Sequence, residues 1–149
     1  MEVVVDALIV KNNKILMVQE GKKEKVGRYQ KWKLPGGRIE KGEHPINAVK
    51  RELLEETNCK IEPKEILPII RISNNWGELF LIVYVSEMIE EDIKYDTKEI
   101  QDVKWIEIDE IKNKKIPQSD ENIMNKIIDN YEKNKIFSLN VFDEEIFIW

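Results

Sequence analysis

The segment Arg51 to Thr57 constrains this chain most, because it places three acidic residues within five positions. In a helix, residues three and four positions apart share one face, so Glu52 would face both Glu55 and Glu56. Like charges at this spacing destabilise a helix by roughly a few tenths of a kcal/mol per pair, unless a divalent cation lies between them. Carboxylate oxygens favour hard cations, so the cluster predicts a Mg²⁺ or Mn²⁺ site.

A second face of the same segment would hold the helix in place. Its apolar residues recur with the spacing of a buried stripe, at Ile46, Val49 and Leu53. Pro45 suits the first helical position, and Asn58 tolerates the left-handed conformation that often ends a helix. We therefore predict a helix that begins near His44 or Pro45, ends at Asn58, packs one face and binds metal with the other.

Upstream residues extend this segment into a longer motif. It reads Gly37, five residues, Glu43, seven residues, Arg51-Glu52, two residues, Glu55-Glu56, and then an apolar close. This motif resembles the signature of the Nudix hydrolases. The chain departs from the family pattern at Asn58, where the family has glycine, and at His44, where it has a small hydroxyl residue. Neither departure removes a carboxylate.

The resemblance implies a hydrolase that splits a phosphoanhydride in a nucleoside diphosphate linked to another group, by attack of water at phosphorus. The acidic residues of the helix would hold the metal: Glu52, Glu55 and Glu56. Arg51 would orient one of these carboxylates, and Glu43 would support the site from outside the metal ligands. A backbone carbonyl of the glycine turn, which we place at Gly37, would add a ligand, since glycine lets the backbone approach an ion closely.

A further carboxylate is often needed to accept a proton from the attacking water. Glu99 is the leading candidate, because the stretch before the strand-like residues 103–106 resembles the place where the family frequently has such a group. Glu90, Glu91 and Asp102 are alternatives.

Aromatic and basic residues near the motif are candidates for substrate contact. The aromatic side chains that could stack on a nucleobase or a sugar are Trp32, Tyr29 and Trp76, with core packing as the alternative. Basic residues cluster before the motif, from Lys22 to Lys33, and include Arg28; Arg38 continues the cluster. This cluster is either a solvated loop between strands or a flap that contacts phosphate.

Length and composition fit a single domain spanning residues 1–149. With 42% hydrophobic residues the chain has enough apolar material for a core, yet no apolar run approaches the roughly 20 residues of a membrane-spanning helix. The first residues lack the features of a signal peptide, and the one cysteine, Cys59, excludes an internal disulfide and is expected to be buried. We therefore expect a soluble, cytoplasmic protein.

The order of predicted elements indicates an α/β fold. Predicted strands cover residues 3–10, 15–19, 32–34, 79–85 and 103–108, with a β-rich stretch at 61–73 and a second helix that opens at residues 119–121. This order resembles the family's α/β/α sandwich with a central mixed sheet, over roughly residues 1 to 135. The apolar tail, residues 136–149, is predicted to form a β-hairpin that folds back onto its own domain or pairs in a homodimer.

Substrate identity depends on loops rather than on the motif. The marks of ADP-ribose, NADH and coenzyme A subfamilies are absent, so the default substrate is a small nucleotide, such as a nucleoside or deoxynucleoside triphosphate. A net charge of −5 argues against a broad nucleic-acid surface. The alternatives are an RNA 5′-end pyrophosphohydrolase and a non-catalytic Nudix-like domain that binds nucleotides and regulates.

Overall fold

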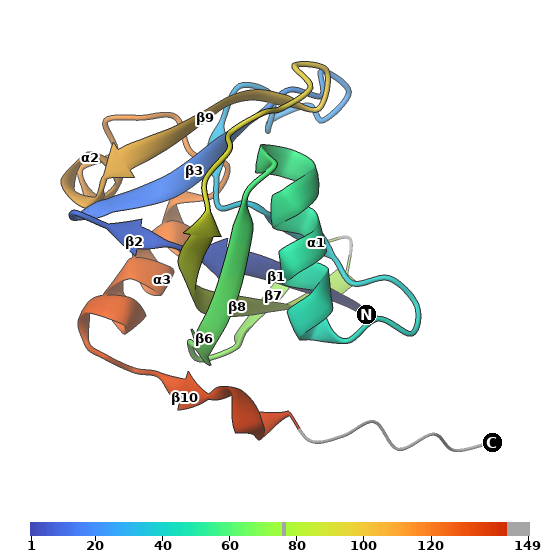
Figure 1. Ribbon diagram of the computed structural model, residues 1–149. Coiled ribbons are helices and arrows are strands. Elements are labelled where there is room, and N and C mark those ends of the chain that lie inside the picture. The colour runs from blue at the N-terminus through green and yellow to red at the C-terminus, as the bar shows by residue number, and fades with distance from the viewer. Residues whose placement is uncertain (76, 143–149) are drawn as a thin grey trace.

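A computed structural model describes residues 1–75 and 77–142 of the chain. Within these residues the elements follow in the order β1 (Glu2–Leu8), β2 (Val10–Lys11), β3 (Lys14–Glu20), β4 (Trp32–Lys33), β5 (Gly36–Arg38), α1 (Pro45–Thr57), β6 (Lys60–Ile66), β7 (Ile70–Asn74), β8 (Gly77–Glu90), β9 (Ile100–Glu107), α2 (Ile108–Lys112), α3 (Glu121–Glu132), β10 (Phe137–Ser138) and the 3₁₀ helix η1 (Leu139–Val141) (Figure 1).

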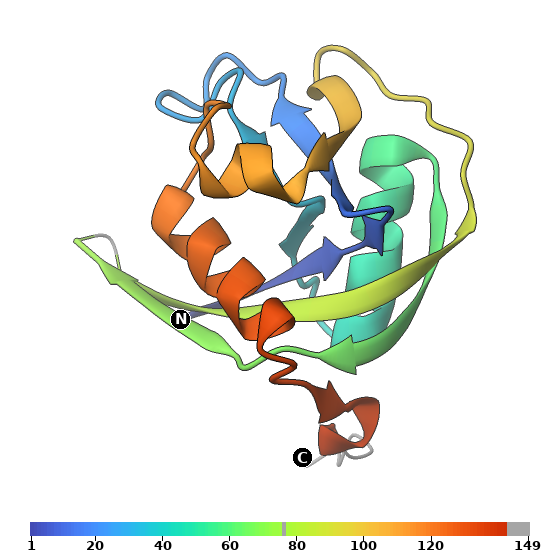
Figure 2. The ribbon, with the colours of Figure 1, turned by 90° about the vertical axis from the view of Figure 1, so that its left-hand side faces the viewer.

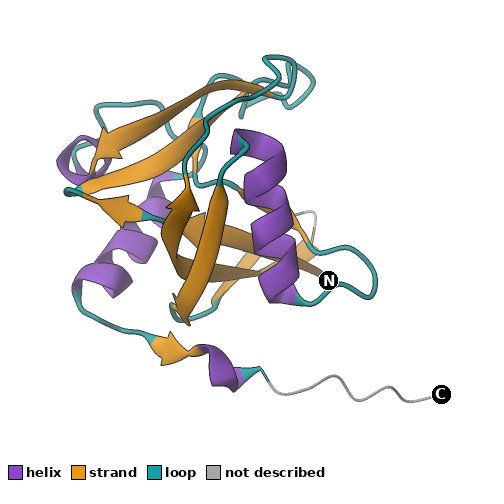
Figure 3. Ribbon diagram, in the orientation of Figure 1, coloured by secondary structure: helices purple, strands orange, loops and turns teal. Residues whose placement is uncertain are grey.

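The strands form two sheets (Figure 3). The larger is mixed and has the order β10-β6-β8-β1-β5, with β7 beside the first part of β8. In it β1 runs parallel to β8, and the other pairs are antiparallel. The smaller sheet is antiparallel. In it β2 and β4 pair with the two ends of β3, and β9 pairs with β3 along the whole length of β3. The predicted mixed sheet is confirmed, and a second sheet accompanies it.

Helices α1 and α3 lie on opposite sides of the larger sheet (Figure 2). Two clusters of buried apolar residues fill the two spaces. One joins α1 to the sheet through Ala48, Val49, Leu53, Val5 and Ile82. The other joins α3 to the opposite face through Met124, Ile127, Ile128, Leu81 and Val83. The strands of the smaller sheet contribute to both clusters. Since helices cover both faces of the mixed sheet, the predicted α/β/α sandwich is confirmed.

Helix α1 begins and ends as the sequence predicts. The ring nitrogen Nδ1 of His44 accepts a hydrogen bond from the backbone N–H of Ile46 at 3.2 Å, so a histidine caps the helix where the family has a hydroxyl residue. At the other end Asn58 adopts the left-handed conformation with φ 61°. Cys59, which follows, is buried, as predicted.

Three stretches differ from the sequence-based prediction. The predicted strand 3–10 divides at Ile9 into β1 of the larger sheet and β2 of the smaller sheet. The β-rich stretch at 61–73 divides into β6 and β7, and Pro68 lies between them, where it has no N–H to donate to a strand ladder. Ile108, predicted as the end of a strand, instead begins the short helix α2. The acidic residues of its first turn, Asp109 and Glu110, favour a helix start.

The predicted terminal hairpin is wrong for its first arm. Only Phe137 and Ser138 form a strand, which pairs with Ile66 and Glu65 of β6. Residues 139–141 form η1 instead, because the Ser138 hydroxyl accepts a hydrogen bond from the backbone N–H of Asn140 at 3.2 Å. The described part of the tail therefore folds back onto its own domain. Residues 143–149, which include the predicted second arm, lie outside the described residues.

Every helix in the described part of the chain is too short or too polar to cross a lipid bilayer.

Candidate active site

The glycine turn of β5 lies directly against helix α1. Gly36 and Gly37 pair with Asp6 and Val5 of β1, which fixes their place in the sheet. A Cβ atom at Gly37 would lie within 3.0 Å of the carboxylate of Glu52. A side chain at this position would displace the Glu52 carboxylate, so glycine lets that carboxylate lie against the turn.

Arg51 organises the acidic residues at one end of the site. Its Nε and Nη2 atoms donate to the two oxygens of Glu43 at 2.7 and 2.9 Å, a bidentate pair. Its Nη1 atom donates to Glu52 at 2.9 Å and more weakly to Glu55 at 3.4 Å. The hydrogen bonds from Arg51, followed by that from the backbone N–H of Glu40 at 3.0 Å, lower the pKa of Glu43 to about 2. Arg51 thus holds together carboxylates that would otherwise repel one another.

Glu56 has a different set of partners. The backbone N–H of Gly36 donates to its Oε1 atom at 2.7 Å, and the ammonium group of Lys33 lies 3.1 Å from its Oε2 atom. Burial raises the pKa of Glu56, against the opposing effect of Lys33 and the Gly36 N–H. Burial alone would lower the pKa of Lys33, but the negative charges of Glu56 and Asp6 outweigh it, and the pKa is raised.

Asp6 is a member of the site that sequence analysis missed. Its Oδ1 atom would touch a Cβ atom placed at Gly36, so the carboxyl lies against the glycine turn. Burial raises the pKa of Asp6 to about 7, with Glu56 and Glu52 adding to the rise and Lys33 opposing it. Asp6 is the one charged residue in the apolar run 3–10, and this exception in the sequence could have marked it as a candidate site residue.

We predict that Asp6→Asn makes the free energy of unfolding less dependent on pH. The unfolded chain loses the Asp6 proton near pH 3.8 and the folded protein near pH 7, so ionisation favours the unfolded state as the pH rises between these values. At pH 8 the variant should be more stable than the unmodified protein by on the order of 4 kcal/mol, and at pH 4 the difference should fall below about 1 kcal/mol.

Urea denaturation in EDTA at pH 4, 6 and 8 measures this difference. Asp109→Asn, at an exposed position of α2, is the matched control and should leave the pH dependence unchanged. A constant difference between Asp6→Asn and the unmodified protein at all three pH values would contradict the assignment.

The donor chemistry of the site fits a hard divalent cation. Glu52, Glu55 and Glu56 offer carboxylate oxygens from one helix, and the glycine turn keeps the adjoining space free of side chains. Among residues 1–75 and 77–142, however, no three acidic, histidine or cysteine side chains are arranged to hold an ion. Arg51 contacts Glu52 and Glu55, while Lys33 contacts Glu56, so the protein's own cations satisfy the carboxylates.

The predicted base, Glu99, lies in the segment between β8 and β9. Its side chain is 58% exposed and forms an ion pair with Lys22 at 2.7 Å. The backbone N–H of Gly21 donates to the Glu99 carbonyl. The segment that carries Glu99 therefore lies beside the basic loop, residues 21–31, which joins β3 to β4 (Figure 1). Within the described residues, no hydrogen bond or ion pair links Glu99 to Glu52, Glu55 or Glu56.

The alternative bases have partners of their own. Glu90 pairs with Lys60 at 3.2 Å, Asp102 with Lys104 at 3.1 Å, and Glu91 with Trp105 and Lys11. None of these partners belongs to the acidic motif.

The described residues among those predicted to contact substrate differ in burial and in their partners. Trp32 is only 7% exposed and packs in the core, which supports its alternative role. Arg28 is exposed in the loop before β4, and Tyr29 beside it is half-buried. Arg38 is 76% exposed and pairs with Glu2 at 3.2 Å. Trp76 lies outside the described residues.

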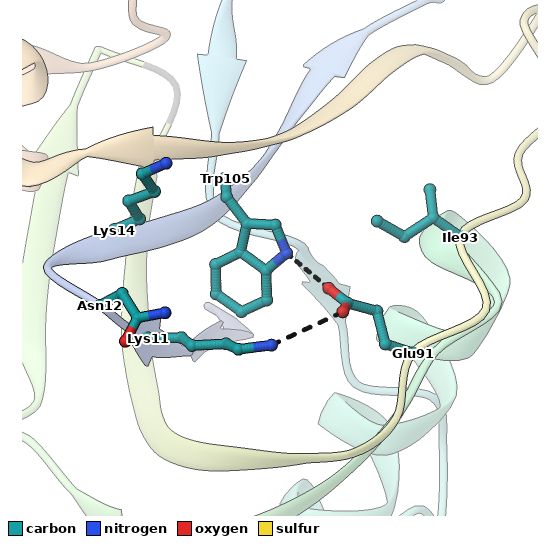
Figure 4. Close-up of a pocket in the computed structure, with 6 residues that line it drawn as sticks. All are labelled: Lys11, Asn12, Lys14, Glu91, Ile93 and Trp105. Carbon is teal, nitrogen blue, oxygen red and sulfur yellow. Dashed lines mark hydrogen bonds and ion pairs between the residues drawn. The ribbon is translucent and has the colours of Figure 1, made fainter.

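A surface cavity of about 410 Å³ lies away from the acidic motif, between the β2–β3 turn and β9 (Figure 4). Its lining residues are Lys11, Asn12, Lys14, Glu91, Ile93 and Trp105. Glu91 accepts a hydrogen bond from the Trp105 ring nitrogen and lies 3.8 Å from the Lys11 ammonium group. Lys11 and Glu91 are thus paired within the cavity, while Lys14 pairs with Glu107 of β9 at 3.7 Å.

Solved structures share this fold. A NUDIX hydrolase from Nitrosomonas europaea superposes with a TM-score of 0.84 at 28% identity, and the match covers 97% of each chain. A MutT protein from Methanosarcina mazei Go1 superposes with a TM-score of 0.76 at 21% identity, over 90% of this chain and 95% of that one. At 21% identity the second likeness shows the fold alone.

Curated relatives match part of the chain. The human 8-oxo-dGDP phosphatase NUDT18 is 34% identical over 74 residues, which are 50% of this chain and 22% of that protein. The ADP-ribose pyrophosphatase of Methanocaldococcus jannaschii is 33% identical over 66% of this chain and 59% of its own length. The RNA pyrophosphohydrolase of Pelagibacter ubique is 32% identical over 54% of this chain and 61% of its own. The chain therefore spans less than two thirds of each.

The family model described as the NUDIX domain matches residues 1–127. This range contains the glycine turn of β5, its neighbouring strand β1 and helix α1. The chain is thus similar to known members in both sequence and fold. The chain therefore belongs to the Nudix family of hydrolases, as its motif predicts.

Proposed function

We propose that this protein is a metal-dependent pyrophosphohydrolase that cleaves the phosphoanhydride of a small nucleotide, such as a nucleoside or deoxynucleoside triphosphate. The observation that carries the proposal is the contact between the acidic face of α1 and the glycine turn, where Gly36 binds Glu56 and Gly37 makes room for Glu52. The named relatives in the family are phosphatases and pyrophosphatases.

Charge neutralisation is the main task of such a site. A pyrophosphate carries negative charge on several oxygens, which repels an incoming oxygen nucleophile. A bound Mg²⁺ or Mn²⁺ ion would neutralise this charge and lower the pKa of a bound water. Glu52, Glu55 and Glu56 would hold the ion, with a carbonyl of the glycine turn at Gly36 or Gly37. Arg51 and Glu43 would keep these carboxylates in position.

Glu99 remains the proposed acceptor of the water's proton. Its exposed carboxylate lies on a segment that adjoins the basic loop, and its ion pair with Lys22 links the two. An ion pair between exposed groups is weak, so the carboxylate can separate from Lys22 when substrate binds.

Two observations favour the alternative function, an RNA 5′-end pyrophosphohydrolase. A relative of that name matches more than half of the chain. Residues 23–28 of the basic loop are exposed and could follow an RNA backbone. Against it stands the net charge of −5, which favours a small substrate.

A substrate panel tests the proposal. The purified protein is incubated with Mg²⁺ or Mn²⁺ and nucleoside triphosphates, 8-oxo-dGDP, ADP-ribose and 5′-triphosphate RNA, and the phosphate-bearing products of each compound are separated by chromatography and measured. We expect turnover of a nucleoside triphosphate or diphosphate. Preference for RNA would select the alternative reading, and tight nucleotide binding without turnover of any compound would indicate a regulatory domain.

A further inference from the structure

We propose that Lys33 acts as an internal cation that holds the place of the divalent ion at Glu56, and that ion binding releases its ammonium group to the phosphates of the substrate. The first half concerns ion binding alone. The second half rests on the proposed function, because it requires a phosphate-bearing substrate.

The geometry around the Lys33 ammonium group is that of a cation site. Its Nζ atom lies 3.1 Å from Oε2 of Glu56 and 3.4 Å from the carbonyl oxygen of Gly36. A carboxylate oxygen and a backbone carbonyl are also the donors that hard divalent cations take. The other oxygen of Glu56 is held by the Gly36 N–H at 2.7 Å, so the Glu56 carboxylate is fixed with Oε2 toward Lys33.

An ammonium group and a divalent ion would compete for these oxygens. The Glu56 side chain is only 13% exposed and that of Lys33 27%, so solvent screens little of the repulsion between an ammonium group and an incoming ion. The ion would therefore bind Glu56 only after the ammonium group has moved. In this way Lys33 keeps a partly buried carboxylate paired before the ion arrives, at the cost of weaker ion binding.

The released ammonium group needs another anion. Lys33 lies on β4, three residues before Gly36, and its flexible four-carbon stem keeps the charge near the glycine turn. A phosphate brought to Glu56 by the ion is the nearest new anion, and lysine binds phosphate well as a point charge. Asp6, which also interacts with Lys33, is the competing destination within the protein.

Manganese binding tests the first half without any substrate. Free Mn²⁺ is followed by electron paramagnetic resonance while it is titrated into the unmodified protein, Lys33→Met and Lys33→Gln. We expect both variants to bind Mn²⁺ about tenfold more tightly, since the competing charge is gone. Lys31→Met removes a charge from the same segment and should stay within about twofold of the unmodified protein. Unchanged or weaker binding in the Lys33 variants would overturn the proposal.

Folding of the variants is checked by thermal unfolding in EDTA. Lys33→Met leaves Glu56 without its cationic partner, whereas the amide of Lys33→Gln can still donate a hydrogen bond to that carboxylate. If Lys33→Met fails to fold, Lys33→Gln decides the ion-binding question.

Kinetics at saturating Mn²⁺ test the second half. We expect KM for the preferred nucleotide to rise about tenfold in both Lys33 variants, the opposite direction to the change in Mn²⁺ affinity. A structural defect would weaken both. Tighter Mn²⁺ binding with an unchanged KM would mean that Lys33 turns to Asp6, and the phosphate contact would be wrong. Absence of turnover in the unmodified protein would overturn the proposed function and leave the Mn²⁺ result standing.

Discussion

Glu56→Gln is expected to lower kcat by about three orders of magnitude or more, with little effect on the fold. Glu56 is an acidic residue of α1 that the backbone holds directly, through the Gly36 N–H at 2.7 Å. Glutamine keeps the shape of the side chain and one acceptor for that N–H, but it removes the negative charge that an ion requires. Steady-state kinetics with the preferred substrate of the panel, at saturating Mg²⁺, measure the change.

The other acidic residues should show a graded response. Glu55 is 58% exposed and its hydrogen bonds with Arg51 are long, so Glu55→Gln should cost less than Glu56→Gln. Glu99→Gln should lower kcat by about two orders of magnitude if Glu99 accepts the proton. Glu110→Gln, at an exposed position on α2, is the matched control and should keep full activity. Full activity in Glu56→Gln would contradict the assignment of the site.

Gly36→Ala is expected to lower the free energy of unfolding by more than about 3 kcal/mol, or to prevent folding. A Cβ atom at this position would overlap the carbonyl oxygen of Val5 and the Cα atom of Asp6. These are backbone atoms of β1, a central strand between β5 and β8, so they cannot move without breaking strand pairing. Urea denaturation at pH 7 in EDTA measures the loss.

Gly37→Ala is the matched control for this experiment, because the three atoms nearest to its Cβ atom all belong to the carboxylate of Glu52. That carboxylate is the far end of a flexible side chain and can move. The stability loss should therefore stay below about 1 kcal/mol, while the displaced carboxylate should reduce turnover. Equal stability loss in the two variants would show that the clash with β1 is relieved in some other way.

The sequence predicted the parts of the site that depend on local order. Helix α1 has the predicted start and end, since a proline, a cap and a residue in the left-handed conformation act within one or two turns. The acidic residues share one face because helical spacing alone decides this. Glu43 lies beside Arg51, eight residues along the chain, where the family motif implies a supporting role.

The residues that sequence analysis missed act over longer distances. Lys33 belongs to a basic cluster, and only the fold shows that this lysine alone reaches Glu56, 23 residues away. Asp6 meets Gly36 through the register of β1 and β5, which no local pattern specifies. The burial of Trp32 has the same origin, because a predicted stacking residue and a core residue look alike in a short apolar strand.

The sequence by itself determined the family, the α/β/α architecture, the helix that carries the acidic residues and the need for glycine beside it. The family and the architecture are implied by the resemblance of the motif to the family signature. The helix and its acidic face follow from periodicity and spacing within a short segment, where local geometry decides which side chains meet. The tertiary structure alone decided that Lys33 and Arg51 divide the carboxylates between them, that Asp6 joins the site, and that the tail pairs with β6. Each of these contacts depends on how strands distant in sequence pair and on the burial that results, and both are properties of the whole fold.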